Sequence, residues 1–382
     1  MPVYFDHNAT TRLDPRVLDA MLPFLSGPYG NASSLHRFGR AARDAVEAAR
    51  VQVAALVGAQ AGEVIWTSGG TESNNLALKG VADAASPSRV LYGATEHPAV
   101  METAEALKPR GWGVEAIAVD RQGIVCWDRF AEQLQRAPVK LVALMRANNE
   151  TGVIQDVARA ATMVHAAGAW LHIDAVQAAG KIPVDFAALD CDLMSLSSHK
   201  IYGPKGIGAL IRRAEVDLAP LHHGGAQEHG LRGGTENVAA IAGFGVAAEL
   251  ALQMLAQRMQ HERELRDRLE QGLRGIAGVE IFGEDAERLP NTVQFALHGY
   301  DGEALLMQLD RKGFGVSSGS ACASGRGEPS HVLLGMGVTR EVAKGAIRVS
   351  LGQDNTEAEV DRFLHALSGL AFPVSRLPSP AK

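Results

Sequence analysis

Five stretches of this chain place polar side chains, among them a lysine and an aspartate, directly after short apolar runs. Such runs are typical of buried β-strands, and the carboxyl ends of parallel strands meet at one edge of a sheet, where ligands bind. We therefore expect one composite site. The five groups are Ser68-Gly69-Gly70-Thr71, Glu96-His97, Asn148-Asn149-Glu150, Asp174 with Gln177, and Ser197-Ser198-His199-Lys200.

The stretch TSGGTESNN, residues 67–75, combines a strand end, a glycine turn and the start of a helix. Backbone N–H groups at Gly70 and Thr71, with the positive end of the helix, would form a cradle for a phosphate. The alternative is that Thr71 only caps the helix. The sequence contains no P-loop motif and no dinucleotide-binding fingerprint, so the phosphate would belong to neither class of nucleotide cofactor.

Lys200 closes the stretch SSHK at the carboxyl end of a predicted strand. Burial penalises the charged form of lysine, which favours an amine that can form a Schiff base with an aldehyde. Taken alone, Lys200 is also compatible with an ordinary surface lysine, and Lys205, in the turn-like sequence GPKG, is a competitor. Ser197 and His199 favour Lys200, because both could bind the phosphate of the same cofactor.

Two further strand ends carry groups suited to an aromatic cofactor. Asp174, in HIDAVQ, could keep a pyridine nitrogen protonated, and Gln177 could bond the ring oxygen. His97, in EHPAV, could stack on the ring and carry protons near neutral pH. The alternatives are that Asp174 caps the next helix and that His97 has a structural role. The loop histidines in LHHGGAQEHG have no partners at metal-ligand spacing, so no metal is expected.

The stretch VSSGSACASG, residues 316–325, places Cys322 among serines and glycines, which favour turns and loops. A thiol usually lies in a core, so its position here raises the question of a reactive role, and the alternative is a turn with an incidental cysteine. The other two cysteines, Cys126 and Cys191, are distant in sequence, and the chain contains no CxxC motif. This pattern predicts neither disulfides nor a zinc site and fits a reducing, cytoplasmic setting.

Composition excludes several classes of protein. The chain has 382 residues, 46% of them hydrophobic, and a formal net charge of −6. A nucleic-acid-binding protein would normally carry a basic stripe, so no nucleic-acid partner is expected. The sequence shows neither a secretory signal at its start nor an apolar run long enough to span a bilayer, and we expect no association with membranes.

Strands and helices must alternate to position these groups. Seven predicted strands lie in residues 63–213, with helices between several of them, which indicates an α/β fold with a mostly parallel sheet covered on both faces. A helix is expected at residues 35–57, ending at Gly58. Residues 236–275 are helical and lead to a smaller α+β domain, whose strands lie in residues 291–297, 315–320 and 346–352.

These motifs, in this order, resemble the cysteine desulfurases of the nitrogen-fixation and iron–sulfur-assembly (NifS/IscS) type, which are fold type I, class-V aminotransferase-like enzymes dependent on pyridoxal 5′-phosphate. The resemblance extends from residue 6 to about residue 352 and implies a seven-stranded sheet in a large domain of residues 14–257. A small domain of residues 1–13 and 258–382 would carry the cysteine loop. The matching stretches are DHNATT, YGNASSLHRFGRAAR, TSGGTESNNLAL, EHPAV, ANNETG, HIDAVQAAGKIPVD, SSHKIYGPKGIGAL, GGAQEHGLRGGTEN, SSGSACASG, EPSHVL and AIRVSLG.

The resemblance also implies roles for individual residues in holding the cofactor. Lys200 would bind it covalently and move protons on the substrate Cα, Asp174 would pair with the ring nitrogen, and His97 would stack on the ring. The remaining residues would contact the ring oxygen or the phosphate. These are Gln177 and Asn149 at the ring oxygen, Gly70, Thr71, Ser197 and His199 at the phosphate, and Thr235 at the phosphate of a second copy of the chain in a homodimer.

For the reaction, the resemblance implies that Arg348 binds the carboxylate of L-cysteine and that Asn149 lies near the substrate. The thiolate of Cys322 would take the substrate sulfur as a persulfide, release L-alanine and pass the sulfur to an acceptor or cluster scaffold protein. The alternatives are a selenocysteine lyase, a related aminotransferase, which would not need Cys322, and a non-catalytic sulfur-transfer scaffold.

Overall fold

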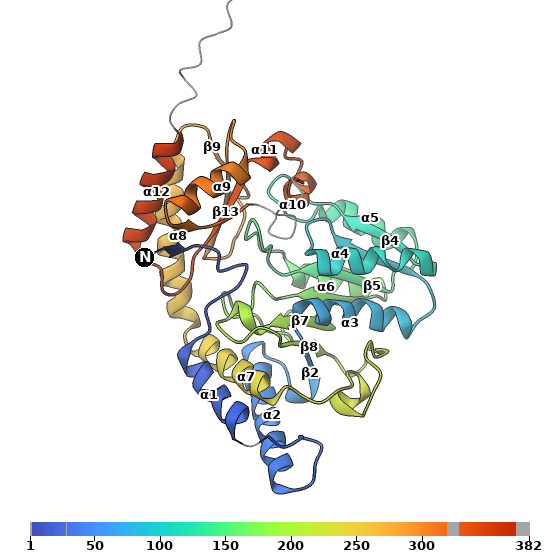
Figure 1. The fold of residues 1–382 in the computed structure, drawn as a ribbon. Helices are drawn as coiled ribbons and strands as arrows, with labels where there is room; N and C mark the ends of the chain where they lie inside the picture. Colours follow the sequence, from blue (N-terminus) through green and yellow to red (C-terminus); the bar gives the residue numbers. More distant parts are fainter. Residues whose placement is uncertain (1, 28, 319–327, 372–382) are drawn as a thin grey trace, which may run out of the picture.

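A seven-stranded sheet forms the centre of the larger part of the chain (Figure 1). The computed structural model describes residues 2–27, 29–318 and 328–371. The strand order is β2-β8-β7-β6-β5-β3-β4, and only β8 runs antiparallel to its neighbours. The strands are β2 (Val64–Thr67), β3 (Arg89–Gly93), β4 (Gly113–Ile117), β5 (Leu141–Met145), β6 (Trp170–Asp174), β7 (Leu193–Ser197) and β8 (Gly208–Arg212).

Helices cover both faces of this sheet, as its apolar strands require. On one face of the sheet, α3 and α4 pack against β3 residues such as Val90 and Tyr92 (Figure 1). On the other face, α2, α5, α6 and α7 form the larger core, which includes Phe130 and Phe244. The predicted α/β fold with a mostly parallel sheet is confirmed. The helices are α1 (Pro15–Ser26), α2 (Arg37–Leu56), α3 (Gly70–Asp83), α4 (Pro98–Glu105), α5 (Trp127–Arg136), α6 (Val157–Ala166) and α7 (Val238–Gln253).

A second core surrounds a four-stranded antiparallel sheet of order β12-β13-β10-β9. The first strand of the chain, β1 (Val3–Tyr4), belongs to this part, because it pairs in parallel with β11 (Phe314–Gly315). The other strands are β9 (Val279–Ile281), β10 (Thr292–Leu297), β12 (Ser317–Ser318) and β13 (Ala346–Ser350). The helices are α8 (Leu255–Arg274), α9 (Gly302–Arg311), α10 (His331–Gly335), α11 (Arg340–Lys344) and α12 (Glu357–Ala371).

Residues 5–14 cross from the small sheet to the large one. Asp6 bridges to Ser350 on β13, and further along the backbone N–H of Thr11 donates to the carbonyl of His199. The segment therefore lies over the carboxyl edge of the large sheet. The predicted domain boundaries near residues 13 and 257 stay a prediction.

Two expectations on helices have definite outcomes. The predicted helix at 35–57 is α2, and Gly58 follows its C-cap with a φ of 62°, in the left-handed region that glycine tolerates. The helical stretch predicted at 236–275 is two helices, α7 and α8, bent by 70°. Among the described residues no single helix has the length and hydropathy to cross a bilayer, although this bent pair passes the same test together.

A buried ion pair holds the long loop between β8 and α7 against the sheet. Arg50 of α2 and Glu228 of the loop form two hydrogen bonds, of 2.8 and 2.9 Å, and both residues are buried. Glu228 also accepts a 2.8 Å bond from the backbone N–H of Trp66 on β2. Removal of either partner would leave an uncompensated charge in a low-dielectric interior.

We predict that Arg50→Ala lowers the free energy of unfolding by about 3–5 kcal/mol, because Glu228 would lose its only described cationic partner in the interior. Urea-induced unfolding followed by circular dichroism measures the change. Glu47→Ala is the matched control, since Glu47 is the exposed partner of the same arginine and such pairs contribute about 0–1 kcal/mol. Equal losses for the two variants would contradict this account.

Candidate active site

A cavity of about 290 Å³ lies at the carboxyl edge of the large sheet, under the crossing N-terminal segment. Ten of the twelve predicted site residues line it, and Thr235 and Cys322 do not belong to its described lining. The ten are Gly70, Thr71, His97, Asn149, Asp174, Gln177, Ser197, His199, Lys200 and Arg348, and they are joined by Asn8, Ala9, Asn74, Met145, Ala147 and Val176.

Lys200 lies in the single 3-10 turn (Ser198–Lys200) that follows β7, and its side chain is half-buried. Its Nζ donates to the backbone carbonyls of Ala9, at 2.8 Å, and of Asn8. The crossing segment therefore holds the amine at the cavity wall. Lys205, the competitor, is exposed and does not line the cavity.

Asp174 ends β6 and is buried, with both carboxylate oxygens bonded. Oδ2 accepts a 2.8 Å bond from Asn74 Nδ2 of α3, and Oδ1 accepts a 3.0 Å bond from the backbone N–H of Val176. The latter bond closes a turn, and because no helix lies in the described residues between β6 and β7, Asp174 does not cap a helix as the alternative supposed. The contact with Asn74, one hundred residues earlier, fixes the carboxylate toward the cavity as well.

The predicted anion cradle is built on glycine. Helix α3 begins at Gly70, and its N-cap is Gly69, with φ 153°, so Thr71 is not the cap and Gly69 has no side chain that could cap the helix. The first N–H groups of a helix lack intrahelical acceptors and can bind an anion. A Cβ at Gly70 would lie 2.8 Å from Val176 Cγ2, so the close approach at this turn requires glycine.

Two strand-end side chains face the same cradle from β7. Ser197 is buried, and Nδ1 of His199 lies 3.1 Å from Thr10 Oγ1. Burial, with a further contribution from the neighbouring Lys200, Lys205 and Lys181, lowers the pKa of His199 to about 4. His199 is therefore a neutral imidazole near pH 7.

His97 is the N-cap of α4, and its Nδ1 accepts a 3.1 Å bond from the backbone N–H of Ala99. The structural role considered as an alternative is thus present. Burial is also the main cause of a lowered pKa, with Lys200 acting in the same direction and Asp174 in the opposite one. Since His97 lines the cavity as well, capping and a function at the cavity are compatible.

Arg348 reaches the cavity from β13 of the small sheet and is 2% exposed. Its Nη2 forms a 2.6 Å ion pair with Asp6, and its Nη1 donates at 2.9 Å to the carbonyl of Asn149. Nε has no hydrogen-bond partner. A buried guanidinium with remaining donor capacity is suited to a small carboxylate.

Sequence reasoning assigned no role to several buried residues near the cavity, although it placed Glu96 and Glu150 among the strand-end groups. Asn8 receives bonds from Lys200 and from Gln177 Nε2, the latter at 2.9 Å, and Glu96 lies fully buried beside Asp174 with its pKa raised well above the usual range by burial. Glu150 is also buried and binds Ser330, just beyond the predicted cysteine loop. Asn8 and Glu96 belong to motifs named above. Their hydrogen-bond partners lie far away in the sequence, so no local pattern could predict these contacts.

The two remaining predicted residues have different outcomes. Thr235 is exposed and lines a separate hollow of about 190 Å³, together with Ser68, so the structure does not bring it into the cavity of its own chain. Cys322 lies outside the described residues. Ser317 and Ser318, which precede it, pair with Arg348 and Ile347 on β13.

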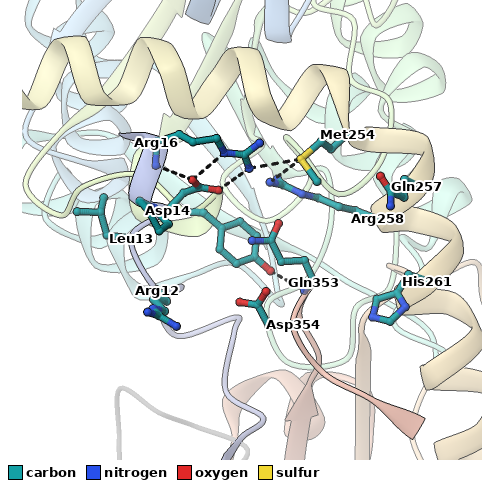
Figure 2. Close-up of a pocket in the computed structure, with 12 residues that line it drawn as sticks. Arg12, Leu13, Asp14, Arg16, Met254, Gln257, Arg258, His261, Gln353 and Asp354 are labelled. Atoms are coloured by element: carbon teal, nitrogen blue, oxygen red, sulfur yellow. Dashed lines mark hydrogen bonds and ion pairs between the residues drawn. The ribbon is translucent and has the colours of Figure 1, made fainter. Parts of the chain in front are cut away.

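A larger hollow, of about 630 Å³, lies at the bend between α7 and α8 (Figure 2). It shares no lining residue with the strand-end cavity. Arg16 and Asp14, two of its charged residues, bond each other at 2.7 and 3.0 Å. Its described lining contains neither a lysine nor a cysteine, so it offers no nucleophile for the predicted chemistry.

The other groups that could carry chemistry are accounted for. In residues 2–27, 29–318 and 328–371 no group of three His, Cys, Asp or Glu side chains is placed to hold a metal ion. Cys191 is buried, and burial raises the pKa of its thiol, which makes it unreactive. Cys126 is the N-cap residue of α5 and is remote from the cavity lining.

We predict that His172, buried on β6 below Asp174, makes the protein less stable in acid. Burial lowers its pKa from 6.5 to about 4, so the unfolded chain binds a proton below about pH 6.5 that the folded chain excludes. Stability from this residue is full above pH 6.5 and falls by about 3 kcal/mol between pH 7 and pH 4.

His172→Gln keeps a hydrogen-bonding group near Ser195 Oγ, its 2.9 Å partner, but does not titrate. Urea unfolding of the ligand-free protein at several pH values should therefore show a smaller fall for the variant. The other buried histidines and carboxyls titrate in both proteins and cancel in the difference. Parallel stability profiles would contradict the assignment.

Comparisons with known proteins agree with this geometry. The aminotransferase class-V family matches residues 3–363. A cysteine desulfurase of Gluconacetobacter diazotrophicus is 47% identical, over 96% of this chain and 93% of its own length, and the cysteine desulfurase IscS of Dictyoglomus turgidum is 43% identical over the same shares. A solved NifS-like protein superposes with a TM-score of 0.91 at 39% identity, covering 97% of this chain and 99% of that protein. The chain therefore belongs to the class-V aminotransferase family and, within it, to the cysteine desulfurases of the NifS/IscS type.

Proposed function

We propose that this chain converts L-cysteine to L-alanine with pyridoxal 5′-phosphate and holds the sulfur as a persulfide on Cys322. One observation carries the proposal. The amine of Lys200, the carboxylate of Asp174 and the guanidinium of Arg348 converge on one cavity, which also contains an anion cradle. The cysteine desulfurase relatives match nearly the whole chain that folds around it.

The residues of the cavity fit the chemical groups of pyridoxal phosphate. Lys200 offers an amine to its aldehyde, and Asp174 offers a fixed carboxylate to its ring nitrogen. The helix start at Gly70, with Thr71, Ser197 and His199, offers neutral donors to the phosphate. Gln177 and Asn149 lie in the same lining and would serve the ring oxygen. When bound, the cofactor supplies an electron sink for the bonds of the substrate Cα.

The residues around the substrate then have defined tasks. Arg348 binds and orients the carboxylate of L-cysteine. Asn149 lies beside Arg348, because its backbone carbonyl accepts a hydrogen bond from Arg348 Nη1. Lys200 would move the proton at Cα, and Asp174 would keep the ring nitrogen of the bound cofactor protonated. His97, in the same cavity lining, would lie against the ring and would exchange protons with the substrate as an acid and base.

Cys322 completes the reaction. Its thiolate attacks the sulfur of the substrate, an S–S bond forms as the C–S bond breaks, and protons return to the carbon skeleton, which leaves as L-alanine. No external oxidant is needed, since L-cysteine and a thiol give L-alanine and a persulfide. Cys322 stands four residues after Ser318, and four residues span at most about 14 Å. The pairing of Ser317 with Arg348 therefore supports its access to the cavity.

A homodimer fits two features of the surface. Exposed leucines Leu18, Leu22 and Leu25 follow one another at helical spacing on α1, and Tyr29 and Leu35 beyond it are 89% and 82% exposed. A cluster of exposed apolar side chains is typical of a protein interface. Thr235, exposed and outside the cavity of its own chain, would reach the phosphate in the other copy.

The sulfur would pass from Cys322 to an acceptor or cluster scaffold protein, and we place this transfer in the cytoplasm, where thiols stay reduced. A selenocysteine lyase or an aminotransferase is not favoured, because the relatives quoted above are cysteine desulfurases. A scaffold without catalysis is not favoured either, because the lysine, carboxylate and arginine of the cavity are all present.

We predict that Cys322→Ser abolishes release of L-alanine from L-cysteine. In the unchanged protein, mass spectrometry after addition of L-cysteine should show a gain of about 32 Da, one sulfur atom, on the peptide that contains Cys322, because a thiolate is the required nucleophile. Cys126→Ser is the control and should keep the activity. Full alanine release by Cys322→Ser would contradict the persulfide step.

We predict that Arg348→Ala lowers kcat/KM for L-cysteine roughly 30- to 150-fold, the equivalent of about 2–3 kcal/mol for a lost charge-assisted pair. Steady-state alanine release measures this change, and the dissociation constant of pyridoxal phosphate should change far less. Arg340→Ala, at an exposed arginine of the same part of the chain, is the control. An unchanged KM for L-cysteine would remove Arg348 from carboxylate binding.

A further inference from the structure

Lys181 is a buried lysine directly behind the cavity, outside its lining. It follows β6 in the chain, seven residues after Asp174. Its Nζ donates at 2.7 Å to Gln177 Oε1 and at 2.8 Å to Asn8 Oδ1. Lys181 thus touches neither the substrate nor the cofactor position, but it holds two residues of the cavity wall.

The first contact decides which end of the Gln177 amide is a donor at the cavity. A lysine nitrogen with two acceptors must donate to both, and even an uncharged amine has two hydrogens for this purpose. Oε1 of Gln177 is therefore occupied as an acceptor, and Nε2, which donates to the carbonyl of Asn8 at 2.9 Å, is the end left for a ring oxygen. Without Lys181 only the bond from Nε2 to the Asn8 carbonyl would hold the amide in this orientation, and Oε1 would lose its donor.

The second contact fixes Asn8. Its Oδ1 accepts from Lys181 and, at 3.1 Å, from Asn291 Nδ2, so its own Nδ2 must donate, and it does so at 2.8 Å to Thr292 Oγ1. The backbone carbonyl of Asn8 in turn accepts a hydrogen bond from the amine of Lys200. Lys181 therefore influences both Gln177 and the anchor point of Lys200.

A buried lysine is stabilised by a nearby carboxylate, and Glu262 of α8 acts on Lys181 electrostatically, although no direct ion pair joins these two described side chains. Burial is the main cause that lowers the pKa of Lys181 to about 7; Glu262 opposes the shift, and Lys200 and Arg348 add to it. Burial raises the pKa of Glu262 to about 7, and Lys181 and Arg258 counteract it. Arg258 lies one helical turn before Glu262, and its guanidinium carbon lies 4.8 Å from the ring centroid of Tyr202.

Charged and titratable groups face Lys181 from several elements of the fold. They come from α8, from the turn after β7, from β13 and from the N-terminal segment. These groups are Glu262, Lys200 and His199, Arg348, and His7.

From these contacts we infer that Lys181, with Glu262 as its countercharge, is a positioning residue, which orients the amide of Gln177 toward the ring oxygen of the cofactor and holds Asn8 under the amine of Lys200. This inference rests on the proposed function, because it assigns the donor that meets the cofactor. It predicts that loss of Lys181 alters the electronic state of the bound cofactor as well as the stability of the protein.

The test compares Lys181→Met, Glu262→Gln and the double variant with the unchanged protein, each loaded with pyridoxal phosphate. The visible absorbance band of the bound cofactor changes with pH, and the pH at which this change is half complete should rise by about one unit in Lys181→Met. The reason is that a donor to the ring oxygen and a nearby cation are both lost. The dissociation constant of pyridoxal phosphate, titrated into the ligand-free protein, should rise about tenfold, as expected for one lost hydrogen bond.

The double variant separates positioning from stability. Lys181→Met alone leaves Glu262 buried without its partner, whereas the double variant removes both charges and should regain most of the thermal midpoint. It should nevertheless keep the raised pH midpoint of the absorbance band. Lys312→Met, at an exposed lysine of the part that contains the small sheet, is the control and should behave like the unchanged protein.

Two outcomes overturn the inference: an unshifted absorbance midpoint in the double variant, or an unshifted midpoint in a folded Lys181→Met protein that is merely less stable. Either would leave Lys181 as a packing residue only. A failure of the proposed function is distinct, because the unchanged protein would then neither bind pyridoxal phosphate nor release alanine.

Discussion

The structure depends on the burial of the large sheet on both faces. A strand covered by helices on each side cannot carry charged groups along its length at acceptable cost, so polar residues collect where the strands end. Parallel direction brings the carboxyl ends of β5, β6 and β7 to one edge, and β8 returns antiparallel without disturbing it. The lysine, the aspartate and the anion cradle therefore meet at this edge although the sequence separates them by up to 130 residues, from Gly70 to Lys200.

A strand edge alone is open to water, and the N-terminal segment closes it. Asn8 is the central residue of this closure: it is 1% exposed and is bonded to Lys181, Gln177 and Lys200 on one side and to Thr292 on the other. Its backbone N–H also donates to Ser350 Oγ. One asparagine thus connects the large sheet to the small sheet that carries Arg348. The relative placement of Lys200 and Arg348, which the proposed function brings to one substrate, is set through this shared residue.

Sequence patterns predicted the parts of the site that depend on local structure. All seven predicted strands of the large sheet are present, and nine residues of the strand-end groups line the cavity, because strand burial and strand ends are visible in short windows. Arg348, on the small sheet, was expected from the family resemblance alone. Asn8 and Lys181 were missed because their partnership joins positions 173 residues apart and neither has a local pattern of its own. The bend at Met254 was also missed, since α7 and α8 form one continuous helical pattern in the sequence.

The charges around the cavity explain why its phosphate cradle consists of neutral donors. Three cations lie in or behind the wall, Lys181, Lys200 and Arg348, opposite the carboxylates of Asp6, Asp174 and Glu262. Lysines near the cradle, together with burial, hold His199 uncharged. A fourth cation at that point would be repelled by Lys200, whose amine must also act as a base. Backbone N–H groups at the start of α3, a serine hydroxyl and a neutral imidazole can stabilise a phosphate without that repulsion, since their dipoles add no net charge.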